Sequence, residues 1–350
     1  MLAEFDIPGH DPDFGRKVQA EIDAKTKPPG SLGRIEALAR QIACAQETLK
    51  PQADPARLLL FAGDHGMVAE GVSAWPSEVT AQMVANFLNG GAAANVFARA
   101  NGISIVIADA GVAVEVPPHP QLKRSGIARG TRNAMHEDAM LPAQLQAALQ
   151  FGANLASQAV DEGNRVLLLG EMGIGNTASA ALLAHSVDGI DLEALTGPGA
   201  GLDAAGVRRK AEILKRIAMR RPGRLAPEDA LCAFGGFEIA AMAGALVAGA
   251  SRRAIVIVDG FIATAAALCA IRARPEALAY AVFAHRSKEP GHRLMLEAIG
   301  ADPLFDLDLR LGEGTGALLA YPLLRAACAM LCEMATFASA GVSGKQDGET

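Results

Sequence analysis

The sequence predicts an α/β fold: a Rossmann-like parallel sheet flanked by helices, with a small helical lobe formed by the N- and C-terminal segments. Short runs rich in Leu, Ile and Val end in Gly or Asp, and each is followed by a segment with helical character. The runs are continuously apolar, as in strands that are buried on both faces of a sheet. Their alternation with helices indicates that neighbouring strands are parallel.

Five apolar runs predict strands, and a weaker run, LFDLDLRLG at 304–312, predicts a sixth. The longest apolar stretch, AIVIVDGFIATAAALCAI, is long enough for a membrane span. Asp259 and Gly260 divide it, so it predicts a strand, a turn and a helix, and no membrane segment. Ligands bind at the carboxyl ends of parallel strands, so functional residues are expected in the loops after these runs. The five runs are 57–64, 103–112, 165–173, 254–260 and 278–285.

The two ends of the chain do not follow this pattern. Residues 51–316 are predicted to form a large α/β domain with the active site, and residues 1–50 and 317–350 to pack together as the small helical lobe. The first segment contains a Pro/Gly turn (KPPGSLG) and one amphipathic helix that begins near Ser31, a candidate N-cap. The second is helical from about Ala317, and its last residues (GVSGKQDGET) are expected to fray.

Composition argues against several classes of protein. The formal charge is −6 and no long Lys/Arg run occurs, so no nucleic-acid partner is expected. The densest basic segment, 208–222, has the spacing of a solvated helix face. The five cysteines include no CxxC pair and the N-terminus lacks the pattern of a signal peptide. We therefore expect a cytoplasmic protein without a structural zinc site.

GEMGIGNTASA, which follows the third strong run, is the most informative loop. Gly173, Gly175 and Ala178 form a loose G-x-G-x-x-A, a pattern typical of dinucleotide sites. Its position in the middle of the chain and the negative charge of Glu171 oppose a pyrophosphate ligand, so a ribose or a single phosphate is expected. Two alternatives remain open at this point: an NAD(P)-dependent oxidoreductase, and a nucleotide-binding protein without catalytic activity.

Other loops predict anion sites or turns. TGPGAGLD is a glycine-rich turn before a helix that contains Lys210, and Ser287 and Lys288 lie in a later turn. Either could hold a phosphate. GDHG lacks the partner residues of a two-metal site, so Asp64 is expected to accept hydrogen bonds from backbone amides in a turn. Trp75, the only tryptophan, could line a pocket for an aromatic ligand.

LGEGTG places Glu313 between two glycines, immediately before an apolar run that predicts a helix. A carboxylate at a helix start is stabilised by the free N–H groups and the helix dipole. The same residue could act as a general base. From the residues alone both interpretations stay open.

Seven segments occur in the order found in one known family: KTKPPGSLGRIE, AGDHG, GEMGIGNTASA, TGPGAGLD, VDGFI, HRSKEPGH and LGEGTGA. From about residue 20 to 338 the chain resembles the nicotinate-nucleotide:dimethylbenzimidazole phosphoribosyltransferases. The resemblance implies transfer of the 5-phosphoribosyl group from nicotinate mononucleotide to 5,6-dimethylbenzimidazole, with inversion, for the lower ligand of cobalamin. It also implies a homodimer, a Rossmann-like sheet, and no cofactor or metal.

This reaction sets the chemistry that the implied site needs. Nicotinate leaves as a neutral ring nitrogen, so no acid is required, unlike glycoside hydrolysis. No pyrophosphate is displaced, so no magnesium is required, in keeping with the absence of a second acid after Asp259. The attacking benzimidazole must lose one proton, so one general base is needed.

The motifs assign residues to these tasks. Glu313 matches the catalytic base, and Glu171 matches a second acid that would contact ribose or stabilise the developing cation. Phosphate and ribose would be bound by Gly173, Gly175, Asn176, Gly199, Gly201, Lys210 and Ser287. The benzimidazole would contact Ser77, Gln82 and Leu311, and Trp75 is a local departure that could reshape this pocket. The preferred lower-ligand base stays open.

Overall fold

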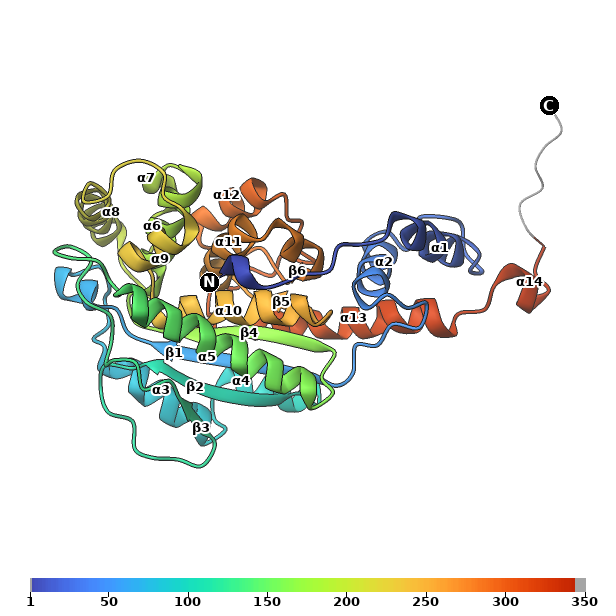
Figure 1. Cartoon of the computed structure of the whole chain (residues 1–350), viewed down its shortest axis with the longest axis horizontal. Coiled ribbons are helices and arrows are strands. Elements are labelled where there is room, and N and C mark those ends of the chain that lie inside the picture. Colours follow the sequence, from blue (N-terminus) through green and yellow to red (C-terminus); the bar gives the residue numbers. More distant parts are fainter. Residues whose placement is uncertain (1, 344–350) are drawn as a thin grey trace.

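The computed structural model describes residues 2–343, which form a six-stranded parallel sheet with helices on both faces (Figure 1). The strand order is β3-β2-β1-β4-β5-β6, and every neighbouring pair is parallel. This arrangement confirms the predicted fold class. The strands are β1 (Ala56–Gly63), β2 (Ser104–Gly111), β3 (Leu122–Arg124), β4 (Val166–Met172), β5 (Ile255–Val258) and β6 (Ala281–Phe283).

Helices account for most of the remaining chain. They are α1 (Pro12–Asp23), α2 (Arg34–Gln46), α3 (Glu78–Leu88), α4 (Ala93–Ala100), α5 (Pro142–Asp161), α6 (Asn176–Asp188), α7 (Leu192–Leu195), α8 (Ala204–Ala218), α9 (Pro227–Phe234), α10 (Phe237–Ser251), α11 (Phe261–Ala273), α12 (Pro290–Ile299), α13 (Thr315–Glu333) and α14 (Phe337–Ala340). Short 3-10 helices occupy η1 (Leu2–Glu4), η2 (Gly66–Glu70) and η3 (Pro275–Tyr280).

The centre of the sheet is covered on both faces, as the continuous apolar runs predict. Leu58 faces the start of α13, whereas Leu167 and Val256 face α10. Because side chains alternate along a strand, these contacts place α10 and α13 on opposite faces. All of β5 is buried, and so is β4 except for its last residue, which is partly buried. The carboxyl ends of β4 and β5 therefore form the floor of any site at that edge.

Two strand predictions need correction. Residues 304–312 form an extended segment with one isolated bridge, His285 to Phe305, and no strand. Its acidic residues are exposed, and Asp308 has a left-handed backbone (φ 56°), so the segment does not continue the sheet. Conversely, β3 was not predicted, because it has three residues and two of them are exposed and basic.

The N-terminal segment contains two helices, not the single helix predicted. α2 begins at Arg34 with Gly33 as its N-cap, three residues after the predicted start near Ser31. Before it, α1 is capped by the side chain of Asp11, which accepts from the N–H of Asp13. The predicted N-cap at Ser31 fails because its segment is a turn.

Helices of the two terminal segments lie side by side, whereas residues 2–8 lie against the α/β part of the fold. Lys25 Nζ donates to the Met334 carbonyl at 3.0 Å, the Thr26 N–H donates to Ala335 at 3.0 Å, and α2 packs on α13. In Figure 1, α1 and α2 lie beside the distal half of α13. The expected boundary at 316/317 falls inside α13, whose first half packs on β4 and β5. The division into two domains stays a prediction, and the expected fraying of 344–350 lies outside the described residues.

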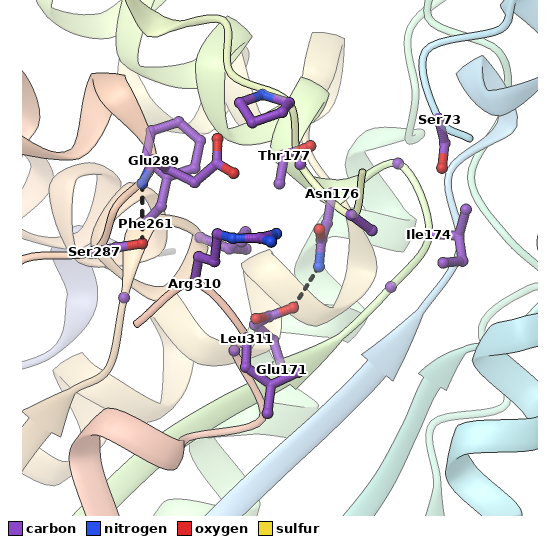
Figure 2. Close-up of a pocket in the computed structure, with 18 of the residues that line it drawn as sticks. Ser73, Glu171, Ile174, Asn176, Thr177, Phe261, Ser287, Glu289, Arg310 and Leu311 are labelled. Atoms are coloured by element: carbon purple, nitrogen blue, oxygen red, sulfur yellow. Dashed lines mark hydrogen bonds between the residues drawn. The ribbon is translucent and has the colours of Figure 1, made fainter. Parts of the chain in front are cut away.

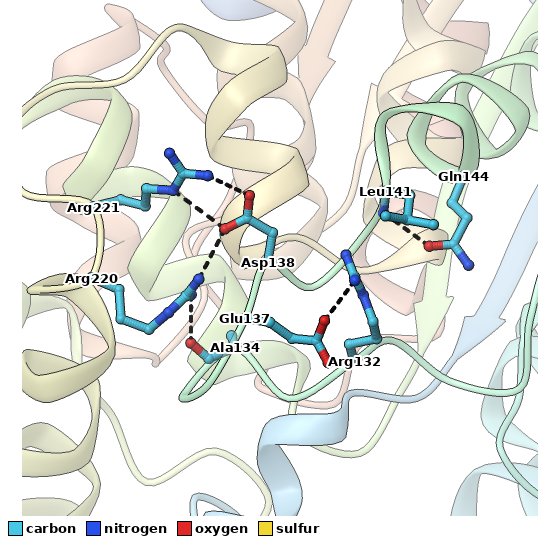
Figure 3. A network of polar contacts seen from close by, with 8 residues as sticks. All are labelled: Arg132, Ala134, Glu137, Asp138, Leu141, Gln144, Arg220 and Arg221. Carbon is cyan, nitrogen blue, oxygen red and sulfur yellow. Dashed lines mark hydrogen bonds and ion pairs between the residues drawn. The ribbon is translucent and has the colours of Figure 1, made fainter.

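A cluster of charged residues ties the segment before α5 to the end of α8 (Figure 3). Asp138 accepts from Arg220 at 3.0 Å and from Arg221 at 2.6 Å. The Arg221 guanidinium lowers the pKa of Asp138 below its usual value. The predicted solvated basic face is confirmed for Arg208 and Arg209 on α8, but Lys210 of the same helix is buried. Arg220 and Arg221 lie beyond the end of α8 and make the contact with Asp138.

Between residues 2 and 343, α13 is the one helix with the length and mean hydropathy of a membrane span. It contains Pro322, and 61% of its most apolar window is buried within the fold. Core helices of globular proteins share these properties, so the length and mean hydropathy of α13 are weak evidence that it crosses a membrane.

Candidate active site

A pocket opens at the carboxyl ends of β4, β5 and β6, where the loops predicted to hold function come together (Figure 2). Its volume is about 830 Å³, including open solvent at the entrance. Four predicted glycine-rich or polar segments line it, contributed by the β4–α6 turn, the α7–α8 loop, the β6–α12 loop and the loop before α13. Among the lining residues are Glu171, Gly173, Gly175, Asn176, Thr177, Gly199, Lys210, Ser287, Glu289, Arg310, Leu311 and Gly312.

The β4–α6 turn requires glycine for two different reasons. A Cβ at Gly173 would lie 2.3 Å from the Gly63 carbonyl, so only glycine allows this approach of β4 to β1. Gly175 has φ 94° and is the N-cap of α6. The first turn of α6 therefore borders the pocket, where a helix N-terminus favours an anion.

Support for this turn comes from α3 and the end of β1. Thr80 Oγ1 accepts from the Ile174 N–H at 3.1 Å and donates to Asp64 Oδ1 at 2.6 Å. Asp64 Oδ2 accepts from the Ala113 N–H at 2.8 Å, which confirms that this acid binds backbone amides. Next to it, His65 Nε2 lies 2.7 Å from Glu238 Oε1. These buried groups hold the turn but do not line the pocket.

Glu171, at the end of β4, is 5% exposed and forms part of the pocket floor. Asn176 Nδ2 donates to its Oε2 (Figure 2). Burial and then the negative charges of Asp259 and Glu238 raise the pKa of Glu171 to about 8. A carboxyl with this pKa favours the protonated form at neutral pH, in which it can donate a hydrogen bond.

The segment Gly312–Glu313–Gly314 has three consecutive left-handed residues, with φ of 86°, 62° and 76°. A Cβ at Gly312 would lie 2.2 Å from Glu171 Oε1, and one at Gly314 would lie 2.6 Å from Leu58 Cδ1. The glycines flanking Glu313 are thus required by close packing and by the backbone. A left-handed Glu between them stores strain of the kind found at functional sites.

The Glu313 side chain is buried and is not among the residues that line the pocket, although Gly312 is. Its Oε2 accepts from the Ala94 N–H at 3.2 Å, at the start of α4, and its own N–H donates to the Glu171 carbonyl at 3.1 Å. Burial raises the pKa of Glu313. Such a shift moves a carboxylate toward the range in which a general base is effective at neutral pH.

At the other side of the pocket lies a buried cation. Lys210 is 1% exposed, and its Nζ donates to Thr177 Oγ1 at 2.8 Å and to the Gly197 carbonyl at 3.3 Å. Burial lowers the pKa of Lys210 to about 8, against the opposing charge of Glu289. Ser287 lies nearby, and its Oγ accepts from the Glu289 N–H at 3.3 Å, which leaves the hydroxyl proton for a ligand.

Some predicted site residues lie outside this pocket. Gly201 does not line it, and Ser77 is the N-cap of α3 without a side-chain capping bond. Gln82 is exposed on α3, whereas Leu311 lines the pocket and is largely exposed. Trp75 is half-exposed, and its Nε1 donates to the Ala200 carbonyl at 2.7 Å.

Several lining residues were not predicted as site residues, among them Thr177, Phe261, His285, Glu289 and Arg310. Thr177 lies within GEMGIGNTASA, Phe261 within VDGFI, and both His285 and Glu289 within HRSKEPGH, so their position in those motifs was an available signal. Arg310 lies outside these motifs and reaches the pocket because separate loops converge there.

Among residues 2–343 no group of three or more His, Cys, Asp or Glu side chains has the geometry to hold a metal ion. The pocket instead combines a buried cation, a helix N-terminus and a protonated carboxyl. This combination suits a phosphorylated sugar.

A family model described as phosphoribosyltransferase matches residues 7–342. The chain belongs to this family. A protein of Ralstonia nicotianae is 51% identical over 97% of this chain and 96% of its own length, and one of Dechloromonas aromatica is 50% identical over 99% and 100%. Both are named nicotinate-nucleotide–dimethylbenzimidazole phosphoribosyltransferase.

Solved structures of the family agree with this fold. The crystal structure of the enzyme of that name from Thermus thermophilus superposes with a TM-score of 0.91 at 43% identity, covering 96% of this chain and all of that one. A second structure from the same organism, titled CobT, gives 0.92 at 44% identity over 95% and 99%. The family resemblance expected from the motifs is therefore confirmed.

Proposed function

We propose that this protein transfers the 5-phosphoribosyl group from nicotinate mononucleotide to 5,6-dimethylbenzimidazole or a related base, in the synthesis of the nucleotide loop of cobalamin. The products are α-ribazole 5′-phosphate and nicotinate. The observation that carries the proposal is one pocket with Lys210 and the α6 N-terminus at one side and the Glu171 carboxyl on its floor. The names of the nearly full-length relatives support the same reaction.

The nucleotide is assigned to the pocket. Lys210, Ser287 and the amides near Gly173 and Gly175 hold the phosphate, with a weaker contribution from Gly199. Gly201 belongs to the same loop but does not line the pocket. Asn176 and Glu171 contact the ribose. Protonated Glu171 donates a hydrogen bond to a ribose oxygen, and loss of its proton would add negative charge beside a developing cation.

The base is assigned to the side of the 312–314 segment where the Glu313 side chain meets the start of α4. Glu313 takes the proton from one benzimidazole nitrogen while the other nitrogen attacks the anomeric carbon, opposite the departing nicotinate, so the configuration inverts. Nicotinate leaves as a neutral ring without a proton donor. Ser77, Gln82 and Leu311 contact the base, and Trp75 lies beside it.

We infer further that the protein is a cytoplasmic homodimer. The expected mass in solution is twice the 36.1 kDa of one chain. Sedimentation equilibrium at several concentrations measures this directly. A mass of one chain throughout would contradict the dimer and leave the chemistry unaffected.

The deciding experiment incubates the protein with nicotinate mononucleotide and dimethylbenzimidazole in the presence of a chelator. Chromatography should show equal amounts of nicotinate and α-ribazole phosphate, and NMR of the product should show the α-anomer. A panel of benzimidazoles, purines and phenols in competition would rank the acceptor bases. Absence of product with every base between pH 6 and 9 would overturn the proposal.

A further inference from the structure

Glu289 is a buried acid of the pocket, and the proposed reaction assigns it no role in binding or catalysis. It is 5% exposed, and Figure 2 shows its carboxyl pointing into the pocket between Thr177 and Arg310. It occupies the N-cap position of α12, but its side chain makes no capping hydrogen bond there. Helix capping therefore does not explain this acid.

The hydrogen-bond partners of Glu289 are incomplete. Its Oε2 is buried and has no hydrogen-bond partner in residues 2–343. A Cβ at Gly197 would lie 2.0 Å from this oxygen, so the glycine makes the space it occupies. An unpartnered buried carboxylate oxygen is costly, which means that a donor supplied by a ligand would be strongly favoured.

The nearby cations do not supply the missing hydrogen bond to Glu289. Lys210 Nζ is engaged by Thr177 and Gly197, and no Lys or Arg of the described chain lies within 4.0 Å of the Glu289 carboxyl. Burial raises the pKa of Glu289 and outweighs the effects of Lys210, the Gly199 N–H and Arg310. Space that a ligand can occupy therefore separates the Glu289 carboxyl from Lys210 and Arg310.

We propose that Glu289 is a specificity-determining residue that accepts a hydrogen bond from an O–H group of the bound nucleotide. This inference rests on the proposed function, which puts a phosphoribosyl group in the pocket. That group has two kinds of O–H donor, the ribose hydroxyls and the P–OH of a monoanionic phosphate. An acceptor at this position selects for the donor, because a ligand lacking it leaves Oε2 unpaired.

Recognition of a ligand hydroxyl by Glu289 must be distinguished from a purely structural role of this side chain. Glu289 could only hold the Gly199 loop or balance the charge of Lys210. Its removal would then weaken every ligand by the same factor. Recognition of a hydroxyl instead predicts coupling between the side chain and the hydroxyl.

The experiment measures that coupling with Glu289→Ala and, as a variant of nearly identical shape, Glu289→Gln. Affinities for nicotinate mononucleotide and its 2′-deoxy and 3′-deoxy analogues are measured by calorimetry, and kcat and KM are measured for each. For the wild-type protein, loss of the recognised hydroxyl should weaken binding on the order of 10- to 100-fold, as for a hydrogen bond to a charged group. In Glu289→Ala the same loss should change binding less than about threefold.

The phosphate arm compares affinity for the intact nucleotide between pH 5.5 and 7.5, across the second phosphate pKa of about 6. If the P–OH is the donor, the wild-type protein binds more tightly at low pH and Glu289→Ala loses that preference. The other titratable groups lining the pocket are Glu171, Lys210, His285 and Arg310, and they are the same in all variants.

Glu297→Gln is the matched control, since Glu297 is exposed on the same helix and pairs with Arg293. It should behave like the wild-type protein in both arms. Coupling in either arm supports the proposal and identifies the donor. Equal losses for all ligands at all pH values would overturn it. Because binding is measured without the acceptor base, a protein that binds but does not turn over would contradict the proposed function alone.

Discussion

At the scale of single residues, Glu171 and Glu313 are two neighbouring acids with different surroundings. Glu171 lies on the pocket floor beside Asp259 and Glu238, and burial with their charge raises its pKa to about 8. Glu313 is buried against the start of α4, and burial raises its pKa as well. Pairs of acids in unlike environments commonly divide proton-transfer tasks between them.

The proton on Glu171 should be visible in the pH dependence of stability. The folded state keeps this proton up to about pH 8, whereas the carboxyl's ordinary pKa is 4.5. The free energy of unfolding should therefore fall as pH rises through this window, by up to about 1.4 kcal/mol per pH unit for one proton. Asp259, with its pKa raised to about 7, acts in the same direction.

Glu171→Gln isolates this contribution, because the amide resembles the protonated acid. Urea unfolding at pH 5.5, 6.5, 7.5 and 8.5 should show a shallower fall for the variant than for the wild-type protein. Parallel curves would mean that Glu171 is ionised in the folded protein.

Glu313→Gln should lower kcat by on the order of 10² to 10⁴, the usual contribution of a general base, and leave the KM for the benzimidazole nearly unchanged. Steady-state kinetics at saturating nucleotide provide the measurement. Glu333→Gln, an exposed acid at the other end of the same helix, is the control. A fall in kcat of less than tenfold would assign the proton to another group.

At the scale of secondary-structure elements, Asp259 joins the end of β5 to the start of α13. Its Oδ2 accepts from the Gly314 N–H at 3.2 Å and its Oδ1 from the Ala317 N–H at 3.0 Å. α13 therefore receives its N-terminal partner from a distant strand, because Gly314 at its N-cap has no side chain. This contact also fixes the segment that contains Glu313.

Asp259→Ala should lower the free energy of unfolding by about 1–3 kcal/mol, because buried N–H groups lose their acceptor. It should also lower kcat, because the strained 312–314 segment loses the hydrogen bond that the Gly314 N–H donates to Asp259. Urea unfolding and kinetics test both effects. Asp11→Ala removes an exposed side-chain cap from α1, far from the pocket, and should affect stability alone. Equal kinetic effects of the two variants would contradict the anchoring role of Asp259.

α5 and α10 pack so closely that glycine is required between their backbones. A Cβ at Gly244 would lie 2.0 Å from the Leu149 carbonyl, whereas one at Gly249 would meet only side chains, at 3.0 Å or more. Gly244→Ala should therefore destabilise the fold by about 1–3 kcal/mol. Gly249→Ala should change stability by less than about 1 kcal/mol, since its neighbours can adjust and helix propensity improves. Thermal unfolding of the two variants and the wild-type protein measures both changes in stability.

At the scale of the whole molecule, the sequence was sufficient for the fold class and for the loops that form the pocket. Continuous apolar runs such as 165–173 identify buried strands, and parallel strands place their following loops at one edge. The same pattern could not predict β3, because only one of its three residues is buried. It wrongly predicted a strand at 304–312, which alternates like a strand but has exposed acids and a left-handed residue.

The site was predictable only where one motif contains both the residue and its setting. Glu171 and Asn176 lie in the same turn, so their proximity follows from the chain. The unpartnered oxygen of Glu289, and the capping of α13 by Asp259, depend on segments far apart in sequence. Such contacts arise from packing, and no local pattern reveals them.

The hydrogen bond from Trp75 to Ala200 has a practical consequence, because Trp75 is the only tryptophan of the chain. All indole fluorescence therefore originates where two pocket-lining loops meet, with Ser73 and Ala74 on one side and Gly199 and Ala200 on the other. Stopped-flow emission should report nucleotide entry and product departure without an attached dye, and Trp75→Phe supplies the dark reference. The protein thus contains an intrinsic fluorescent reporter beside the pocket, hydrogen-bonded to one of the loops that line it.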